Sequence, residues 1–186
     1  MTAITPPAAL LIIDMQTGIN HPRLGPRNNP EAELRMLELL AAWRLAGHPV
    51  VHVRHISRDP GSVFWPGQSG CEFQPAFAPR AGEALFEKHV PDAFCHTGLE
   101  QWLHARGIGR VVIVGVITNN SVEASARSAG NLGFDTVVVA DACFTFDQPD
   151  LQGRVWSAQD VHTLSLANLA MDYARILDTA QVLDAS

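Results

Sequence analysis

The stretch "GVITNNSVEASARSAGNLGF", from Gly115 to Phe134, changes its character twice along its length. It begins as the end of an apolar strand, passes through a polar turn and continues as a helix rich in small residues. A turn from a strand into a helix is where α/β proteins commonly bind ligands, at the carboxyl edge of a parallel sheet. Ser121 stands where this helix begins, so the stretch predicts an α/β fold and the place of its functional site.

The rest of the chain alternates strands and helices in the same way. The run "AALLIID", from Ala8 to Asp14, is continuously apolar until its last residue, which is typical of a strand buried on both faces of a parallel sheet. The pattern predicts one α/β/α domain of three layers over residues 1–186, with a mostly parallel sheet. Further strands are predicted at 49–54, 110–116, 135–141 and 180–183, and helices at 30–47, 98–107, after Ser121 and at 158–175.

Composition narrows the class of protein. The 186 residues carry a net charge of -6 and no basic patch, which argues against nucleic-acid binding. The sequence has no run of 18 apolar residues that would span a membrane, and its first ten residues lack the pattern of a signal peptide. Cys71, Cys95 and Cys143 have no metal-ligand spacing, so we expect reduced thiols and a cytoplasmic protein.

Three polar residues are expected to meet at the carboxyl edge of the sheet. Asp14 ends the first strand, where a carboxylate serves as a general acid or base. Lys88 lies in a predicted loop, "ALFEKHVPDAF", whose apolar neighbours indicate burial, and a buried ammonium needs a carboxylate partner such as Asp14. Asn120 and Glu123 form a pattern close to a capping box. Ser121 would then be the first helical residue, beside unpaired N–H groups that favour an anion.

Five motifs in this order resemble the isochorismatase-like family of hydrolases. The resemblance implies a catalytic triad of Asp, Lys and Cys, in which Asp14 and Lys88 match and Ser121 stands at the cysteine position. It also implies a cis peptide bond between Val116 and Ile117, with the N–H groups of Ile117 and Ser121 forming an oxyanion hole. The motifs are "LLIIDMQ" at 10–16, "FWPGQSGCEF" at 64–73, "EKHVPDAFCHTGL" at 87–99, the stretch at 115–134, and "VVVADAC" at 137–143.

The serine at position 121 leaves three explanations open. A thiol ionises readily at a helix N-terminus beside a lysine, whereas a serine hydroxyl needs a strong general base. In the first, Ser121 replaces a native Cys. In the second, the serine is natural, and Asp14 activates either its hydroxyl or a water molecule. In the third, Ser121 does not react. The third case corresponds to isochorismatases proper, which the resemblance implies cleave a vinyl ether by protonation from the Asp.

Several further residues are predicted to bind the substrate, and no metal or cofactor is expected. His52 and His55 are three apart on a strand and would point to opposite faces, and no Gly-rich nucleotide-binding pattern occurs. The family implies dimers or tetramers, and the segment 150–173 carries apolar residues outside the sheet pattern, so we expect a homo-oligomer. The predicted substrate contacts are Gln16, Phe64, Trp65, Phe94, Asn119 and Trp156.

The sequence therefore predicts a hydrolase that cleaves a C–N bond of a small amide. In this reading Ser121, or its Cys counterpart, attacks the carbonyl, Asp14 takes the proton, and Lys88 keeps Asp14 charged and orients the nucleophile. The first alternative is hydrolysis of a vinyl ether such as isochorismate without a nucleophile. A catalytically silent binding or assembly module is the second, although retention of both Asp14 and Lys88 counts against it.

Overall fold

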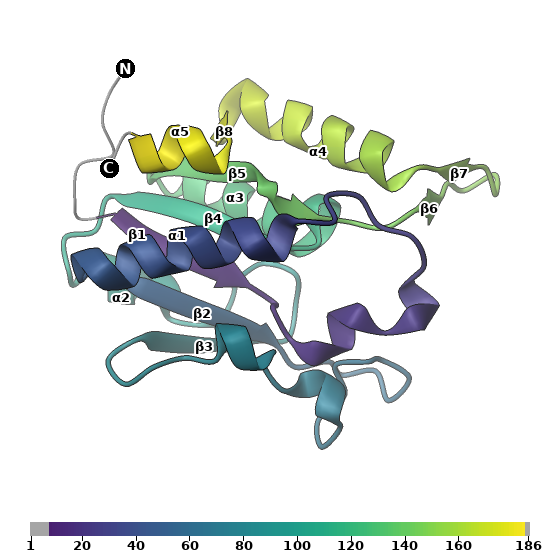
Figure 1. The fold of residues 1–186 in the computed structure, drawn as a ribbon, viewed down its shortest axis with the longest axis horizontal. Helices are drawn as coiled ribbons and strands as arrows, with labels where there is room; N and C mark the ends of the chain where they lie inside the picture. The colour runs from purple at the N-terminus through teal and green to yellow at the C-terminus, as the bar shows by residue number, and fades with distance from the viewer. Residues whose placement is uncertain (1–7, 185–186) are drawn as a thin grey trace.

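The computed structural model describes residues 8–184 of the chain. Its centre is a six-stranded sheet in which all neighbouring strands run parallel, in the order β3-β2-β1-β4-β5-β8 (Figure 1). This confirms the parallel α/β sheet predicted from the alternating pattern. The strands are β1 (Ala8–Ile13), β2 (Val50–His55), β3 (Ala84–Lys88), β4 (Arg110–Val116), β5 (Asp135–Phe144) and β8 (Arg175–Leu177).

The strand order reverses in the middle of the sheet. From β1 the chain proceeds outward through β2 to β3, and it then returns to place β4 on the other side of β1, followed by β5 and β8. Connections leave β1 and β4 in opposite directions, so a crevice opens between their carboxyl ends. All six residues of β1 are buried, as its continuous apolar run predicts, because helices cover both faces of the sheet.

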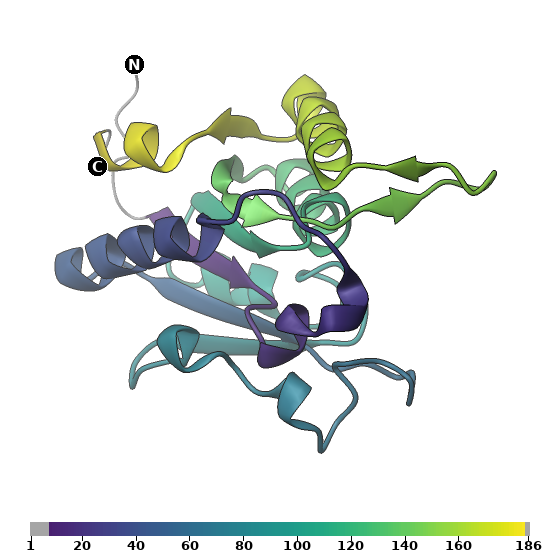
Figure 2. The same ribbon diagram turned by 45° about the vertical axis from the view of Figure 1, so that its right-hand side comes forward.

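Helices form the two outer layers. The core on one face contains buried residues of α1 (Ala32–Ala46) and α5 (Thr179–Asp184), and that on the other contains residues of α2 (Leu99–His104), α3 (Glu123–Asn131) and α4 (Ala158–Asp172) (Figures 1 and 2). The predicted three-layer arrangement is therefore present. No helix within residues 8–184 has the length and apolar character needed to cross a bilayer.

The C-terminal elements differ from the sequence prediction. The helix expected over 158–175 ends at Asp172, and the next three-residue strand, β8, pairs with β5. The segment 180–183, predicted as a strand, belongs to helix α5, with Val182 buried in the same core as α1. A short apolar run is compatible with either a strand or a helix. Here the segment packs against a face of the sheet instead of pairing at its edge, and it is therefore helical.

Strand β3 was missed in the sequence because it lies at the edge of the sheet. Its residues alternate between more and less exposed positions, and Leu85 is 44% exposed, so it lacks the apolar run of a central strand. Lys88 is therefore the last residue of a strand and not part of a loop. The long connection from β2 to β3 contains two short 3-10 turns, at Ser69–Cys71 and Pro75–Phe77.

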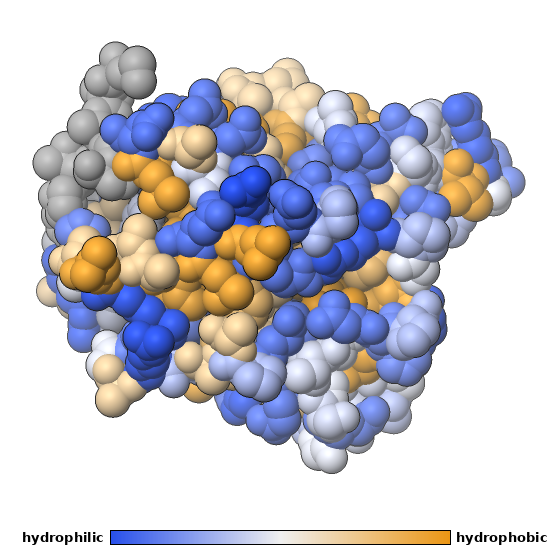
Figure 3. Space-filling model, viewed as in Figure 1, coloured by the Kyte–Doolittle hydropathy of each residue, from blue (hydrophilic) through white to orange (hydrophobic). Residues whose placement is uncertain are grey.

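A two-stranded hairpin extends from the body of the molecule beyond β5. Its strands are β6 (Gln148–Pro149) and β7 (Val155–Trp156), and it projects away from the sheet at the right of Figures 1 and 2. Leu151 at its turn is fully exposed and Val155 is 63% exposed. Figure 3 shows apolar side chains on this projection and over the region of α1. The homo-oligomer expected from the exposed apolar residues stays a prediction.

Substitution of Gly115 tests the close approach of β4 to β1. Gly115 has φ of +121°, and a Cβ atom at this position would lie 2.2 Å from the Ile13 carbonyl oxygen. We expect Gly115→Ala to lower the free energy of unfolding by about 2–4 kcal/mol, since both backbone strain and overlap oppose it. The control is Gly109→Ala, where a Cβ would meet nothing within 4 Å. Urea denaturation of both variants measures the difference, and equal stabilities would contradict the expected overlap.

Candidate active site

Asp14 is the first residue after β1 and lies at the crevice between β1 and β4. Its backbone takes a left-handed conformation with φ of 54°, and its N–H donates to the Val53 carbonyl at 2.9 Å. This turn ends the strand and directs the chain into the loop that starts with Gln16, whose N–H donates to the Asp14 carbonyl. The residue Asp14 is only 4% exposed, so a strand whose residues are all buried places an acidic group at the carboxyl edge of the sheet.

Lys88 reaches the same point from the end of β3, two strands away. Its side chain is fully buried. Immediately before β3, Glu83 accepts hydrogen bonds from Arg44 of α1 at 2.6 and 2.9 Å and pairs with Nε2 of His52 at 2.8 Å. Burial alone would raise the pKa of Glu83, but these bonds and one from the Arg80 N–H lower it to about 2. This ionised cluster fixes the start of the strand whose last residue is Lys88.

Ser121 lies in a five-residue π-helical turn, Thr118–Val122, between β4 and α3. The helix α3 itself begins at Glu123, so the predicted capping box with Asn120 as N-cap is wrong, because the turn postpones the first α-helical residue. The Ser125 hydroxyl donates to the Ser121 carbonyl at 2.7 Å and accepts from the Ala93 N–H at 3.0 Å. These bonds tie the serine to the loop that follows Lys88.

Helix α4 holds the other end of this turn. His162 Nδ1 and the Thr118 hydroxyl form a buried hydrogen bond of 2.8 Å, and the Ser165 hydroxyl lies 3.2 Å from the Thr118 carbonyl. Burial lowers the pKa of His162, which favours the neutral ring in this contact. The peptide bond between Val116 and Ile117 is cis, as the family resemblance implied.

The three side chains meet through the Lys88 ammonium group. Lys88 Nζ donates to Asp14 Oδ2 at 2.7 Å and to Ser121 Oγ at 3.1 Å. The second carboxylate oxygen, Asp14 Oδ1, is buried and has no hydrogen-bond partner among residues 8–184. A single cation therefore bridges a carboxylate and a hydroxyl, and the carboxylate keeps one oxygen free to accept a proton.

The protonation of Asp14 is sensitive to its surroundings. Burial raises the pKa of Asp14, while the charge and hydrogen bond of Lys88 and the Ser121 hydroxyl offset part of that rise. A carboxyl group with a raised pKa is a better base when ionised and is more readily protonated near neutral pH. The site can therefore perform either acid or base chemistry through this one group.

A pocket of about 190 Å³ opens above the three residues. Asp14, Ile117 and Ser121 line it, as does Phe64, which was predicted as a pocket wall. The sequence reasoning missed most other walls, because they come from loops whose positions depend on the fold. These are Ile19, Leu24, Ser62, Pro91 and Phe146. His55, Val116 and Asn120 also line the pocket, and they belong to the strand end and the turn that the sequence places at the carboxyl edge of the sheet.

Five of the six predicted substrate contacts do not line this pocket, and three of these five serve structural packing or lie beside the wall. Gln16 is fully buried. Its side-chain amide accepts a hydrogen bond from the His55 N–H and donates to the carbonyls of His55 and Cys71, so it holds the end of β2 and a loop together. Phe94 is partly buried and packs against Phe134, with ring centroids 5.8 Å apart, at the margin of the core that includes α2. Trp65 follows Phe64 in the sequence but is not among the residues that line the pocket.

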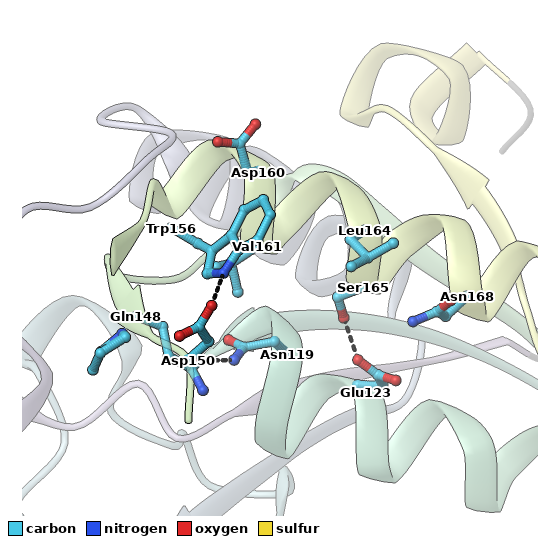
Figure 4. A pocket seen from close by; sticks show the side chains of 11 residues that line it. Asn119, Glu123, Gln148, Asp150, Trp156, Asp160, Val161, Leu164, Ser165 and Asn168 are labelled. Carbon is cyan, nitrogen blue, oxygen red and sulfur yellow. Dashed lines mark hydrogen bonds between the residues drawn. The ribbon is translucent and has the colours of Figure 1, made fainter. Parts of the chain in front are cut away.

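The other two, Asn119 and Trp156, lie in a separate pocket of about 280 Å³ between α4 and the hairpin (Figure 4). Asn119 Nδ2 donates to Gln148 Oε1 at 2.6 Å, and Trp156 Nε1 donates to Asp150 Oδ2 at 3.1 Å. Asn119 belongs to the same π-helical turn as Ser121, but its side chain points to this neighbouring pocket (Figure 4). Contact of either residue with a substrate in the pocket above Asp14 is therefore not supported within one chain.

Other reactive side chains lie outside the cluster. Burial raises the pKa of Cys143 to about 12, and Cys71 also has a raised pKa from burial. Within residues 8–184 no group of three or more His, Cys, Asp or Glu side chains is placed to hold a metal ion. His52 contacts Glu83 while His55 lines the pocket, in agreement with opposite faces of β2.

Comparison with known proteins gives the family. The isochorismatase domain model matches residues 8–181. The chain belongs to the isochorismatase family. A crystal structure of a hydrolase of this family from Chromobacterium violaceum has a TM-score of 0.95 and 46% identity, over 100% of this chain and 96% of that chain.

Two curated relatives extend the comparison. The isochorismatase family protein YrdC of Bacillus subtilis is 35% identical over 176 residues, which are 95% of this chain and 94% of that protein. Maleamate amidohydrolase of Pseudomonas putida is 34% identical over 150 residues, which are 72% of this chain and 70% of that protein. Together with the family match, the amidohydrolase relative identifies this isochorismatase-family protein as a hydrolase.

Removal of Lys88 tests whether the buried pair is as tightly coupled as the geometry indicates. We expect Lys88→Met to lower the free energy of unfolding by about 3–5 kcal/mol, because Asp14 would remain as an uncompensated buried charge. The double variant Asp14→Asn/Lys88→Met should be more stable than Lys88→Met alone.

The control is Arg35→Met, which breaks an exposed pair between Arg35 and Glu38. An exposed pair contributes about 0–1 kcal/mol, so this variant should change stability little. Thermal and urea denaturation provide the values. A Lys88→Met loss no larger than that of Arg35→Met would mean that Asp14 does not depend on Lys88.

Proposed function

We propose that this isochorismatase-family hydrolase cleaves the C–N bond of a small amide, with Ser121 as the nucleophile. The observation that carries the proposal is the position of Lys88 Nζ, which donates to both Asp14 and Ser121. A donor directed at the serine oxygen turns the hydroxyl hydrogen toward other acceptors, and Asp14 Oδ1 has no other partner among the described residues. Asp14 is then the base and Ser121 the group that it activates.

The proposed reaction has two stages. Asp14 removes the hydroxyl proton while Ser121 Oγ attacks the carbonyl carbon, and the proton then passes to the departing amine or ammonia. Lys88 stabilises the negative charge that develops on Oγ, and the N–H groups of Ile117 and Ser121 are proposed to stabilise the carbonyl oxyanion. Water, activated by Asp14, then hydrolyses the acyl-serine ester and regenerates the hydroxyl.

Two further facts support an amide substrate. The maleamate amidohydrolase relative acts on an amide by its name, and it matches 72% of this chain. The other hydroxyl among the described residues that line the pocket, that of Ser62, accepts from the Phe64 N–H, whereas Ser121 Oγ accepts from Lys88. Cys143 is fully buried, and burial raises its pKa to about 12. The hydroxyl of Ser121 is therefore the side chain best placed to form a covalent intermediate there.

A second candidate function uses the same carboxyl group as an acid. The raised pKa of Asp14 favours its protonated form, and a protonated Asp14 could donate a proton to a vinyl ether without participation of Ser121. The two functions require opposite protonation states of Asp14. They can therefore be separated by the direction in which activity changes with pH.

The pH dependence of kcat/KM on an amide tests the role of Asp14. As a base Asp14 must be ionised, so the rate should fall as pH decreases through its pKa. Burial places that pKa above the ordinary value of 3.8, and the acidic limb should lie correspondingly higher. Asp14→Asn should lower the amidase rate by about 10²–10⁴-fold.

Circular dichroism over the same pH range serves as the control for acid unfolding. A rate on isochorismate that instead rises toward low pH, with no measurable amidase activity, would favour the protonated-acid function and refute the proposed one.

Variants of Ser121 test the covalent step directly. We expect Ser121→Ala to lower amide hydrolysis by at least about 10²-fold, and Ser121→Cys to raise it by about tenfold or more, because a thiol beside an ammonium group ionises far more readily than a hydroxyl. Assays on a panel of small amides, including maleamate, with isochorismate alongside give the rates.

Iodoacetamide inactivation supplies a second readout. The Ser121→Cys variant should become sensitive, whereas Cys71 and Cys143 should react slowly because burial raises the pKa of both thiols. The partly buried Cys95 adds to the background, which the unmodified chain measures so that it can be subtracted. If Ser121→Ala hydrolyses amides as fast as the unmodified chain, Ser121 is not the nucleophile.

A further inference from the structure

A second cavity adjoins the active-site pocket, which lies above Asp14 and Ser121. The cavity has a volume of about 600 Å³, whereas the active-site pocket has about 190 Å³. Pockets that enclose drug-sized ligands measure about 300–1,000 Å³, so the active-site pocket holds only the reacting end of a larger molecule. Ser62 lines both spaces, which therefore meet at this residue. A ligand that extends past Ser62 reaches the second cavity.

The same two loops form walls of both spaces. In the loop after β1, Leu24 lines the active-site pocket and its neighbour Arg23 lines the second cavity. In the connection from β2 to β3, Phe64 lines the active-site pocket and its neighbour Val63 lines the second cavity. The loops thus separate an apolar space from a polar one. The other polar side chains that line the second cavity belong to Thr17, Asn20, His21, Gln68 and Ser69.

Direct hydrogen bonds between these loops hold the second cavity open. The Thr17 N–H donates to the Glu72 carbonyl at 2.8 Å, and the Thr17 hydroxyl donates to the Ser69 carbonyl. Arg23 Nη2 donates to the Gly61 carbonyl at 2.8 Å on the other side of the cavity. A cavity whose walls are joined in this way is formed before a ligand arrives, and binding then costs less conformational freedom.

Arg23 gives the second cavity a positive charge. Its guanidinium group has five N–H donors, and the one bond to Gly61 leaves the others available. No Asp or Glu is among the described residues that line the cavity. The carboxylate of Asp59, in the same connection as Gly61, accepts instead from the Gly61 N–H at 2.9 Å. Arg23 is therefore placed to form charge-assisted hydrogen bonds with an anionic ligand.

The active-site pocket itself does not suit an anionic group. No Arg or Lys is among the described residues that line it, and Lys88 already pairs with Asp14. Burial, followed by the positive charge of Lys88, lowers the pKa of His55 to about 4, so this lining residue is neutral near pH 7. A carboxylate there would lose its hydration without gaining a partner. The two spaces therefore favour different parts of one ligand.

We propose that the second cavity is a binding subsite in which Arg23 holds an anionic group at the far end of the substrate. The substrates selected are elongated amides whose apolar body fills the active-site pocket and continues past Ser62 to a carboxylate. A short amide acid such as maleamate would place its carboxylate against the apolar walls and gain nothing from Arg23. The naming of an amide rests on the proposed function, whereas the anion subsite does not.

Binding to the Ser121→Ala variant tests the subsite without turnover. The ligands are the amide acids succinamate, adipamate and suberamate, each compared with the uncharged amide of the same chain length, which is butanamide, hexanamide or octanamide. Isothermal titration calorimetry at low ionic strength should show that the carboxylate strengthens binding by about three- to fivefold in a longer pair, as expected for one accessible ion pair. It should give no advantage to succinamate. Added salt should reduce the advantage.

Substitution of Arg23 in the same background identifies the group responsible. Arg23→Gln should remove the advantage of the carboxylate, and Arg23→Lys, which keeps the charge, should restore part of it. The matched control is Arg58→Gln, because Arg58 is an exposed arginine of the same connection that lines neither space. This control should leave the advantage unchanged. Octanamide binding and circular dichroism report whether each variant remains folded.

The outcomes separate this proposal from the proposed function. The subsite is refuted if the carboxylate gives no advantage at any length, if succinamate gains the most, or if Arg58→Gln reduces the advantage as much as Arg23→Gln does. Amide turnover by the unmodified chain without any carboxylate advantage would refute the subsite and leave the amidase function standing. Binding that depends on Arg23, without turnover of any amide, would support the subsite and refute the amidase function.

Discussion

The buried pair of Lys88 and Asp14 is the interaction on which the active site depends. Both side chains are removed from water, and each charge is tolerated only because the other lies 2.7 Å away. The pair therefore requires that the ends of β1 and β3 arrive at one point. The ionised Glu83, bonded to Arg44 of α1, anchors the start of β3, and the left-handed turn at Asp14 ends β1. Positions far from the pocket thus determine the geometry within it.

The sheet order explains why the site forms where it does. Because β1 and β4 lie side by side while their connections leave in opposite directions, the crevice between their carboxyl ends is open to loops from both halves of the chain. The close approach of the two strands at Gly115 and Ile13 is possible only without a side chain on Gly115. The turn that carries Ser121 is then held by Ser125 from α3 and by His162 from α4.

The same three side chains are compatible with two kinds of chemistry, and the difference lies in one proton. An ionised Asp14 can activate Ser121, and a protonated Asp14 can donate to a substrate. Burial and the neighbouring ammonium group act in opposite directions on this equilibrium. The pocket adds a separate constraint, since its apolar walls and the neutral ring of His55 offer no charge to an anionic substrate.

The sequence by itself determined the class of fold, the family and the three residues that meet at the site. The apolar run at 8–13 indicates a strand buried on both faces, and the alternation around it indicates a parallel sheet, because these patterns reflect local burial. Lys88 could be paired with Asp14 because a buried lysine needs a carboxylate. Only the tertiary structure decided that 84–88 is an edge strand, that 180–183 is helical, and that a π-helical turn precedes α3. It alone also placed Phe146 in the pocket and Asn119 outside it, since side chains in loops and turns acquire their neighbours from elements distant in the chain, which no local pattern of residues encodes.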